Sequence, residues 1–269
     1  MSGTVHAGVA GFPIDHSLSP LIHGAWIRAL RLDAIYQRFG PEDGTAFKAV
    51  VERLRAGEMR GINVTAPYKE RALALADRAS DVARAAGSAN LLVVEDGRLI
   101  AETTDGLGMV LAIREQAPSL DLTSGASVVL GAGGAARAAI RALLDAGAPE
   151  VRIVNRTRAK AEALAERFGA RAAAAGLEAL DGAVLAVNAA VGLEPPDLSG
   201  LAPGGAVMDM TYRPLMTPLL RAARASGLTP VDGLAMLIGQ ARPSFERFFG
   251  VSPPGDVDVR AMAIQAMAA

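Results

Sequence analysis

The chain has 269 residues, of which 51% are hydrophobic and 20% are charged, and its formal net charge at pH 7 is −1. This is the composition of a folded globular protein of two domains or one large one, and it offers no electrostatic basis for binding nucleic acid or a membrane surface. The absence of cysteine excludes disulfides, thiolate nucleophiles and cysteine metal sites. We see no signal peptide and no apolar run long enough to span a bilayer, so we expect a cytoplasmic protein.

The first part of the chain alternates strand and helix patterns. Alternation of this kind predicts an open, mostly parallel sheet with helices on both faces. Ser19 and Pro20 favour a helix start, with the hydroxyl at the N-cap and the proline in the first turn. We expect strands at 5–10, 34–39, 61–65, 89–95 and 99–103, the last two as a hairpin, and helices at 19–30, 47–56 and 68–76.

A glycine-rich turn organises the second part. After a predicted crossing between domains at 104–108 and a helix at 109–116, the apolar strand 126–130 leads into Gly131-Ala-Gly-Gly-Ala135 and the helix 135–146. Gly131, Gly133 and Ala136 follow the dinucleotide-binding pattern, in which glycine lets the backbone approach a pyrophosphate at a helix N-terminus. We therefore predict that Gly131, Ala132, Gly133, Gly134 and Ala135 bind a dinucleotide.

Basic residues follow the next strand, where the ribose-reading residue of such a site belongs. An NAD site has an acid there, which would repel a 2′-phosphate, whereas a guanidinium binds one through paired hydrogen bonds. We infer NADP rather than NAD; a solvated basic helix start is the alternative. The residues in question are Asn155, Arg156, Thr157, Arg158 and Lys160.

The remaining elements complete a Rossmann domain and a helical end. The patterns predict strands at 182–187 and 206–210 and helices at 159–168, 218–225, 232–249 and 257–268, the third of them bent near Pro243.

Lys69 and Asp105 are the candidates for proton transfer. Lys69 lies at the end of the predicted strand that carries Asn63 and Thr65, at the sheet edge where ligands bind in open α/β folds. A carbonyl that accepts hydride also needs a proton, which a lysine held by a carboxylate can supply. The alternatives are a solvated lysine and an aspartate in an ordinary turn.

Ser17 and Ser19 present two hydroxyls at a helix start, which suits a carboxylate ligand, with simple N-capping by Ser19 as the alternative. The histidines have no metal-ligand spacing, so we predict no metal.

Taken together, the motifs resemble the shikimate dehydrogenase family over nearly the full length. The matching stretches, in order, are Ser17-Leu-Ser-Pro20, Asn63-Val-Thr-Ala-Pro-Tyr-Lys69, Gly87-Ser-Ala-Asn90, Thr104-Asp-Gly106, Gly131-Ala-Gly-Gly-Ala135, Asn155-Arg-Thr157, Asp209-Met-Thr-Tyr212 and Asp232-Gly-Leu-Ala-Met-Leu-Ile-Gly-Gln240.

The resemblance implies an α/β protein of two domains with the site in the cleft between them. It implies a substrate domain at 1–105, a Rossmann NADP-binding domain at 106–234 and C-terminal helices at 235–269 that return to the first domain. The implied reaction is the reversible NADPH-dependent reduction of 3-dehydroshikimate to shikimate, a step of aromatic amino acid biosynthesis.

The resemblance also implies residue roles. Lys69 would give and take the proton, with Asp105 beside it. The implied substrate ligands are Ser17, Ser19 and Tyr212 for the carboxylate and Asn63, Thr65, Asn90, Asp105 and Gln240 for the ring hydroxyls. Met210 and Gly233 would lie along the nicotinamide, and Asp81 near the cofactor.

Some positions depart from the family pattern, namely Leu91, Thr103, Ala190, Arg213 and Ala235. They leave open a sister enzyme that uses quinate or an amino analogue. An NADP-binding sensor without catalysis is a third alternative, against which the intact Lys69 and Asp105 argue. The sequence does not fix the oligomeric state, and a homodimer stays open.

Overall fold

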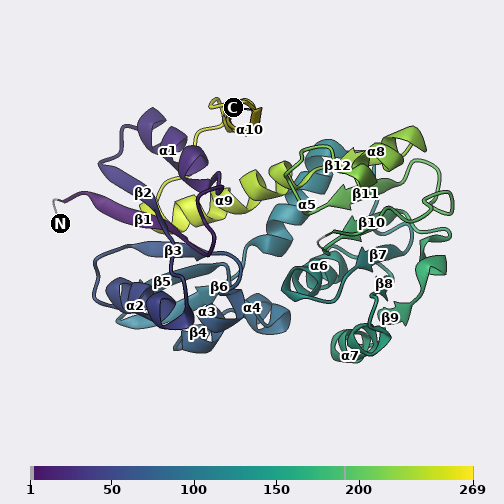
Figure 1. The fold of residues 1–269 in the computed structure, drawn as a ribbon, viewed down its shortest axis with the longest axis horizontal. Coiled ribbons are helices and arrows are strands. Elements are labelled where there is room, and N and C mark those ends of the chain that lie inside the picture. Colours follow the sequence, from purple (N-terminus) through teal and green to yellow (C-terminus); the bar gives the residue numbers. More distant parts are fainter. Residues whose placement is uncertain (1–2, 191, 269) are drawn as a thin grey trace. The chain divides into compact units, whose positions relative to one another are not determined.

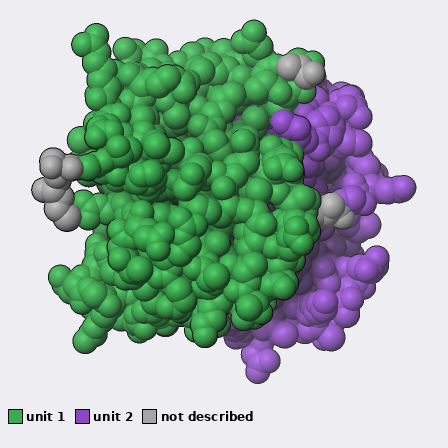
Figure 2. Space-filling model, turned by 60° about the vertical axis from the view of Figure 1, so that its left-hand side comes forward, with its two compact units in different colours: residues 1–104, 240–269 green, residues 105–239 purple. Residues whose placement is uncertain are grey.

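The chain forms two compact units in the computed structural model, which describes residues 3–190 and 192–268. Unit 1 comprises Met1–Thr104 and Gln240–Ala269, and unit 2 comprises Asp105–Gly239 (Figure 2). The chain thus leaves unit 1 after Thr104 and re-enters it at Gln240, inside helix α9 (Gly233–Phe249).

Unit 1 contains a six-stranded sheet in the order β2-β1-β3-β5-β6-β4 (Figure 1). The pairs β1–β2, β1–β3 and β4–β6 are parallel, and β3–β5 and β5–β6 are antiparallel. The strands are β1 (Val5–Ala10), β2 (Ala34–Phe39), β3 (Gly61–Val64), β4 (Arg78–Ala79), β5 (Leu91–Glu95) and β6 (Arg98–Glu102).

The β5–β6 hairpin that the sequence predicts is confirmed. Asp96 and Gly97 both have positive φ, at 49° and 71°, as a two-residue hairpin turn requires. The hairpin reverses the chain so that Asn90 and Thr104 flank it at one edge of the sheet, the edge at which β3 ends.

Helices cover both faces of this sheet. On one face, α2 (Gly44–Arg55) and α3 (Lys69–Leu75) bury apolar side chains against Ile62 and Val64. On the other face, the rings of α1 (Ser19–Ala29) pack against the rings in the second half of α9. The remaining helices of unit 1 are α4 (Asp81–Ala86) and α10 (Val259–Ala268).

Two helix starts in unit 1 differ from the prediction. The N-cap of α1 is Leu18 rather than Ser19, and no side chain in the described part of the chain caps it; instead the Ser17 hydroxyl accepts from the Ser19 N–H at 3.4 Å. Helix α2 begins at Gly44, before the predicted start, because the Asp43 carboxylate accepts from two N–H groups of the first turn at 2.8 Å. The sequence analysis also missed β4 and α4.

Unit 2 contains a fully parallel six-stranded sheet in the order β12-β11-β10-β7-β8-β9, and the predicted Rossmann-type fold is confirmed. The sequence analysis missed two strands, because β9 consists only of alanine and β12 contains Pro230 at the sheet edge. The strands are β7 (Ser127–Leu130), β8 (Val151–Val154), β9 (Ala172–Ala175), β10 (Leu185–Asn188), β11 (Ala206–Asp209) and β12 (Thr229–Val231).

Helix α5 (Asp105–Gln116) begins four residues before the predicted start at 109, within the stretch predicted as a crossing between domains. The glycine in its first turn serves close packing: a Cβ at Gly106 would lie 2.7 Å from the Cβ of Ala142 in α6 (Gly134–Asp145). The other helical elements of unit 2 are α7 (Arg158–Phe168), the 3₁₀ turn η1 (Leu177–Leu180), α8 (Pro218–Ala225) and the first half of α9. None of the helices in the described residues is long and apolar enough to cross a membrane.

Candidate functional site

The predicted glycine turn joins β7 to α6. Gly131 has a φ of 123°, and a Cβ there would lie 3.2 Å from the carbonyl carbon of Ala189. Gly133 is the N-cap of α6, and a Cβ there would meet no described atom within 4 Å. Gly134 and Ala135 form the first turn, so Gly131-Ala-Gly-Gly-Ala135 leads directly into a helix N-terminus, which favours negative charge.

A cavity of about 170 Å³ lies beside this turn. Two of its residues, Arg156 and Lys160, are exposed cations whose side chains make no hydrogen bond or ion pair within the described part of the chain. Asn155 donates from Nδ2 to the Thr157 carbonyl at 2.9 Å, which fixes the loop after β8. The lining residues are Ala132, Gly133, Asn155, Arg156, Thr157 and Lys160. Unpaired cations beside a helix start form a site for an anion such as a phosphate.

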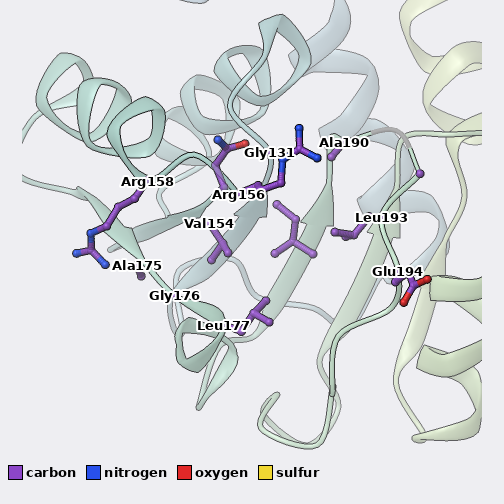
Figure 3. A pocket seen from close by; sticks show the side chains of 13 residues that line it. Gly131, Val154, Arg156, Arg158, Ala175, Gly176, Leu177, Ala190, Leu193 and Glu194 are labelled. Carbon is purple, nitrogen blue, oxygen red and sulfur yellow. The ribbon is translucent and has the colours of Figure 1, made fainter.

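Arg158 differs from Arg156 in its partners. The Arg158 Nε lies 2.9 Å from the Glu162 carboxylate, one turn further along α7. Figure 3 shows its side chain pointing away from Val154 and Leu193, while Arg156 lies close to Gly131. Of the basic residues predicted after β8, Arg156 and Lys160 thus have no side-chain partner among the described residues, whereas Arg158 has an exposed ion pair with Glu162.

A larger cavity of about 630 Å³ adjoins the same turn (Figure 3). The sequence analysis missed most of its wall, because these residues lie at the ends of β7, β8 and β9 and in the segments after β9 and β10, and it assigned none of them to a ligand. Their position directly after parallel strands was the available signal. The missed lining residues are Leu130, Val154, Ala175, Gly176, Leu177, Ala190, Gly192, Leu193 and Glu194.

Met210 and Gly233 lie together in unit 2. A Cβ at Gly233 would be 2.5 Å from the Met210 carbonyl oxygen, so only glycine lets α9 start this close to the end of β11. Asp209 accepts from the Thr211 N–H at 3.0 Å and thereby shapes the segment that leads to Tyr212. Burial raises the pKa of Tyr212, and the neighbouring Arg213 guanidinium opposes that rise.

A cluster of amide side chains forms in unit 1. Asn63 lies in β3, Asn90 precedes β5, and Gln240 belongs to α9, yet hydrogen bonds connect all three. The Asn63 Nδ2 donates to the Asn90 carbonyl at 3.1 Å, and the Asn90 Nδ2 donates to the Gln240 Oε1 at 3.4 Å. The backbone N–H of Thr104 donates to the Asn90 Oδ1 at 2.8 Å, which fixes that amide. Three of the predicted substrate ligands therefore meet at one edge of the sheet.

Lys69 and Thr65 follow β3 at the same edge. Lys69 is the first residue of α3 and is half-buried, and its carbonyl accepts from the Ala89 N–H at 2.9 Å. The Thr65 N–H donates to the Ala10 carbonyl at 2.9 Å, which joins Thr65 to β1. These backbone bonds hold the lysine next to the segment that carries Asn90.

Ser17 and Ser19 stand at the start of α1. Ser17 is buried, and its carbonyl accepts from Arg38 at 2.8 Å. Ser19 is half-buried, and its N–H donates to the Ser17 hydroxyl at 3.4 Å.

The two remaining acidic candidates differ in burial. Asp81 is the first residue of α4, is exposed, and pairs with Arg84. Asp105 is the first residue of α5 in unit 2 and is 2% exposed.

The sequence matches two family models. One is described as the substrate binding domain of shikimate dehydrogenase and matches residues 9–92; the other is described as shikimate / quinate 5-dehydrogenase and matches residues 113–191. The chain is also 51% identical over 269 residues to the NADP⁺ shikimate dehydrogenase of Caulobacter vibrioides, with 96% of this chain and 94% of that protein covered. The chain belongs to the shikimate dehydrogenase family.

Solved structures of the family agree with this membership. Shikimate 5-dehydrogenase from Thermus thermophilus, in complex with NADP(H) and shikimate, has a TM-score of 0.87 and 37% identity, covering 98% of this chain and 99% of that one. Quinate dehydrogenase from Corynebacterium glutamicum, in complex with NAD, has a TM-score of 0.85 and 28% identity, covering 99% and 100%. Structures that resemble this chain are thus named for different substrates and hold different nicotinamide cofactors.

Proposed function

We propose that this protein catalyses the reversible NADP-dependent interconversion of 3-dehydroshikimate and shikimate. The observation that carries the proposal is the amide cluster of Asn63, Asn90 and Gln240 at the sheet edge that also holds Lys69. Such a cluster suits a small molecule with several hydroxyls. When a less polar molecule enters instead, the buried polar groups of the cluster lose their hydrogen-bond partners. Relatives named for this activity, at 51% identity over nearly the whole chain, support the assignment.

The residues of unit 2 fit an NADP molecule. The space beside Gly133 that a Cβ would enter leaves room for a pyrophosphate, and the unpaired Arg156 and Lys160 suit a 2′-phosphate. We assign the pyrophosphate to the turn Gly131–Ala135. Asp81, Met210 and Gly233 are proposed as further cofactor contacts because they match positions of the shikimate dehydrogenase family. When bound, the cofactor supplies the hydride.

Lys69 is proposed as the group that moves the proton. Its ammonium donates a proton to the oxygen of the reacting carbonyl, which becomes a hydroxyl, and the neutral amine takes the proton back in the reverse direction. We assign the acidic partner role to Asp105. Ser17, Ser19 and Tyr212 are proposed as ligands of the substrate carboxylate, and Asn63, Thr65, Asn90 and Gln240 as ligands of the ring hydroxyls.

The test is oxidation of NADPH in the presence of 3-dehydroshikimate, followed by absorbance and repeated with NADH. Turnover with NADPH that exceeds turnover with NADH by a large factor supports both the reaction and the cofactor. Binding of NADPH without turnover of any substrate in the family's range contradicts the proposed reaction and favours a nucleotide-binding protein.

Quinate or an amino analogue is the second candidate substrate. It stays a candidate because Arg213 departs from the family pattern next to Tyr212, and because one matching family model is described as shikimate / quinate 5-dehydrogenase. Comparison of kcat/KM for shikimate and quinate, each with NADP⁺ and NAD⁺, separates the two candidates.

A further inference from the structure

Tyr36 and Asn63 are connected across a strand of the unit 1 sheet. Tyr36 lies in β2 opposite Ala7 of β1, and Asn63 lies in β3 opposite Val9. These residues share one face of the sheet, and the small side chain of Ala7 lets the tyrosine reach across. The Tyr36 hydroxyl donates to the Asn63 Oδ1 at 2.8 Å.

Both protons of the Asn63 side-chain amide donate hydrogen bonds. Its Nδ2 donates to the Asn90 carbonyl at 3.1 Å and to the Ser244 Oγ at 2.9 Å. A carbonyl can only accept, so the nitrogen must face Asn90 and the amide cannot turn over without placing two acceptors against each other. The orientation of Asn63 is therefore decided by its neighbours.

Ser244 completes this arrangement from α9. It is fully buried, and its hydroxyl donates to the Gln240 carbonyl at 3.2 Å. Because its single proton is used there, Ser244 meets Asn63 only as an acceptor. The hydrogen bonds thus run in one direction, from Tyr36 and Asn63 towards the two backbone carbonyls.

The aromatic ring of Tyr36 is also fixed by its neighbours. Tyr36 is buried, and its ring stacks on that of His23 with centroids 4.0 Å apart and an interplanar angle of 6°.

These hydrogen bonds determine which position of the Asn63 side chain is left for a ligand. An amide oxygen accepts two hydrogen bonds, and Tyr36 uses one of them. Asn63 is half-buried, so one acceptor position on its side chain stays open to a ligand once its contacts with described residues are made. A ring hydroxyl, which can donate, fits this position, and a ring carbonyl, which cannot, does not.

We propose that Tyr36 and Ser244 are positioning residues that fix Asn63 as an acceptor, so that this position selects a substrate hydroxyl. The inference rests on the proposed function, because it takes Asn63 to be a substrate ligand.

The test compares Tyr36→Phe and Ser244→Ala with the unchanged protein, measuring kcat, the KM for shikimate, the KM for NADP⁺ and Tm. We expect each variant to raise the KM for shikimate by roughly tenfold, the effect of one lost buried hydrogen bond, and to leave the KM for NADP⁺ within about twofold. In an Asn63→Ala background, Tyr36→Phe should change the KM for shikimate by less than about twofold, because Tyr36 acts through Asn63.

Tyr68→Phe is the matched control. Tyr68 is also a buried tyrosine of unit 1, but its hydroxyl donates to the Pro41 carbonyl at 2.7 Å and its ring stacks on Phe47, away from Asn63. It should lower Tm by a similar amount and leave the KM for shikimate unchanged.

The outcomes separate this inference from the proposed function. An unchanged protein that does not turn over shikimate overturns both. An active protein in which Tyr36→Phe and Ser244→Ala keep their KM, or in which Tyr36→Phe has the same effect with and without Asn63, overturns the positioning role and leaves the proposed function standing.

Discussion

The Arg158 Nε lies 2.9 Å from the Glu162 carboxylate, one helical turn along α7. Two residues earlier, Arg156 lines both cavities beside the glycine turn and makes no side-chain ion pair with any described residue. These neighbouring arginines of one sequence motif both line the larger cavity but differ in their partners, because Arg158 has an exposed ion pair within its own helix.

Arg156→Ala should selectively weaken the binding of NADPH. Loss of charge-assisted hydrogen bonds to a 2′-phosphate should raise the KM for NADPH by roughly 10- to 100-fold, while the KM for NADH changes little because NADH lacks that phosphate. Arg158→Ala is the matched control and should alter both constants by less than about threefold. Steady-state kinetics with the two cofactors measures this, and an unchanged NADPH to NADH preference in Arg156→Ala would falsify the assignment of Arg156.

Lys69→Ala should remove turnover and retain cofactor binding. Loss of the group that moves the proton should lower kcat by at least about 100-fold. Fluorescence titration with NADPH checks that the cofactor still binds, because Lys69 belongs to unit 1 and the assigned phosphate contacts belong to unit 2. Retained turnover in Lys69→Ala would refute Lys69 as the proton-transfer group.

His23 should make the protein sensitive to acid. Burial among aromatic rings lowers the pKa of His23 from 6.5 to about 3 in the folded protein. The unfolded chain therefore binds a proton at a pH where the folded protein does not. The contribution of the neutral ring to stability is complete above about pH 6.5 and is lost as the pH falls towards 3, at roughly 1.4 kcal/mol per pH unit.

The measurement is urea unfolding between pH 7 and pH 4 for His23→Phe and for the unchanged protein. The variant keeps an aromatic ring in the stack but cannot take up a proton, so its free energy of unfolding should fall less steeply with acid. Exposed His16, changed to glutamine, is the control and should leave the slope unchanged. Equal slopes for His23→Phe and the unchanged protein would contradict the argument.

Gln116→Ala should destabilise unit 2. The Gln116 Nε2 donates to the Asp232 Oδ2 at 2.9 Å, and the Asp232 N–H donates back to the Gln116 Oε1 at 2.9 Å. This reciprocal pair joins the end of α5 to the residue before α9, and its loss should cost about 2 kcal/mol. Asp145→Ala, which removes an exposed ion pair with Arg141 on α6, should cost less than about 0.5 kcal/mol. A smaller loss of Tm in Gln116→Ala than in Asp145→Ala would rule out this role.

Local patterns predicted most elements of the fold, and the failures have physical causes. β1 and α8 match their predicted ranges because apolar periodicity and a proline in the first helical turn are encoded in adjacent residues. The start of α5 was placed four residues too late because Asp105-Gly106 is typical of a turn, although the missing side chain of Gly106 serves contact with α6.

Residues joined through distant segments were beyond sequence reasoning. Tyr36 and Ser244 belong to no recognisable motif, and they gain a role only because the sheet and α9 bring them to Asn63. The cavity wall at Leu177 and Leu193 was missed for the same reason, since those loops have no fixed composition.

The sequence by itself determined the glycine turn with its helix start, the basic residues after β8 and the lysine after β3, because each depends on the geometry and chemistry of adjacent residues. Only the tertiary structure decided which way the Asn63 amide faces. That outcome depends on hydrogen-bond partners that folding supplies from separate segments, namely Asn90, Ser244 and Tyr36. A polar group has one best orientation only once its partners are in place, and the chain order alone does not name them.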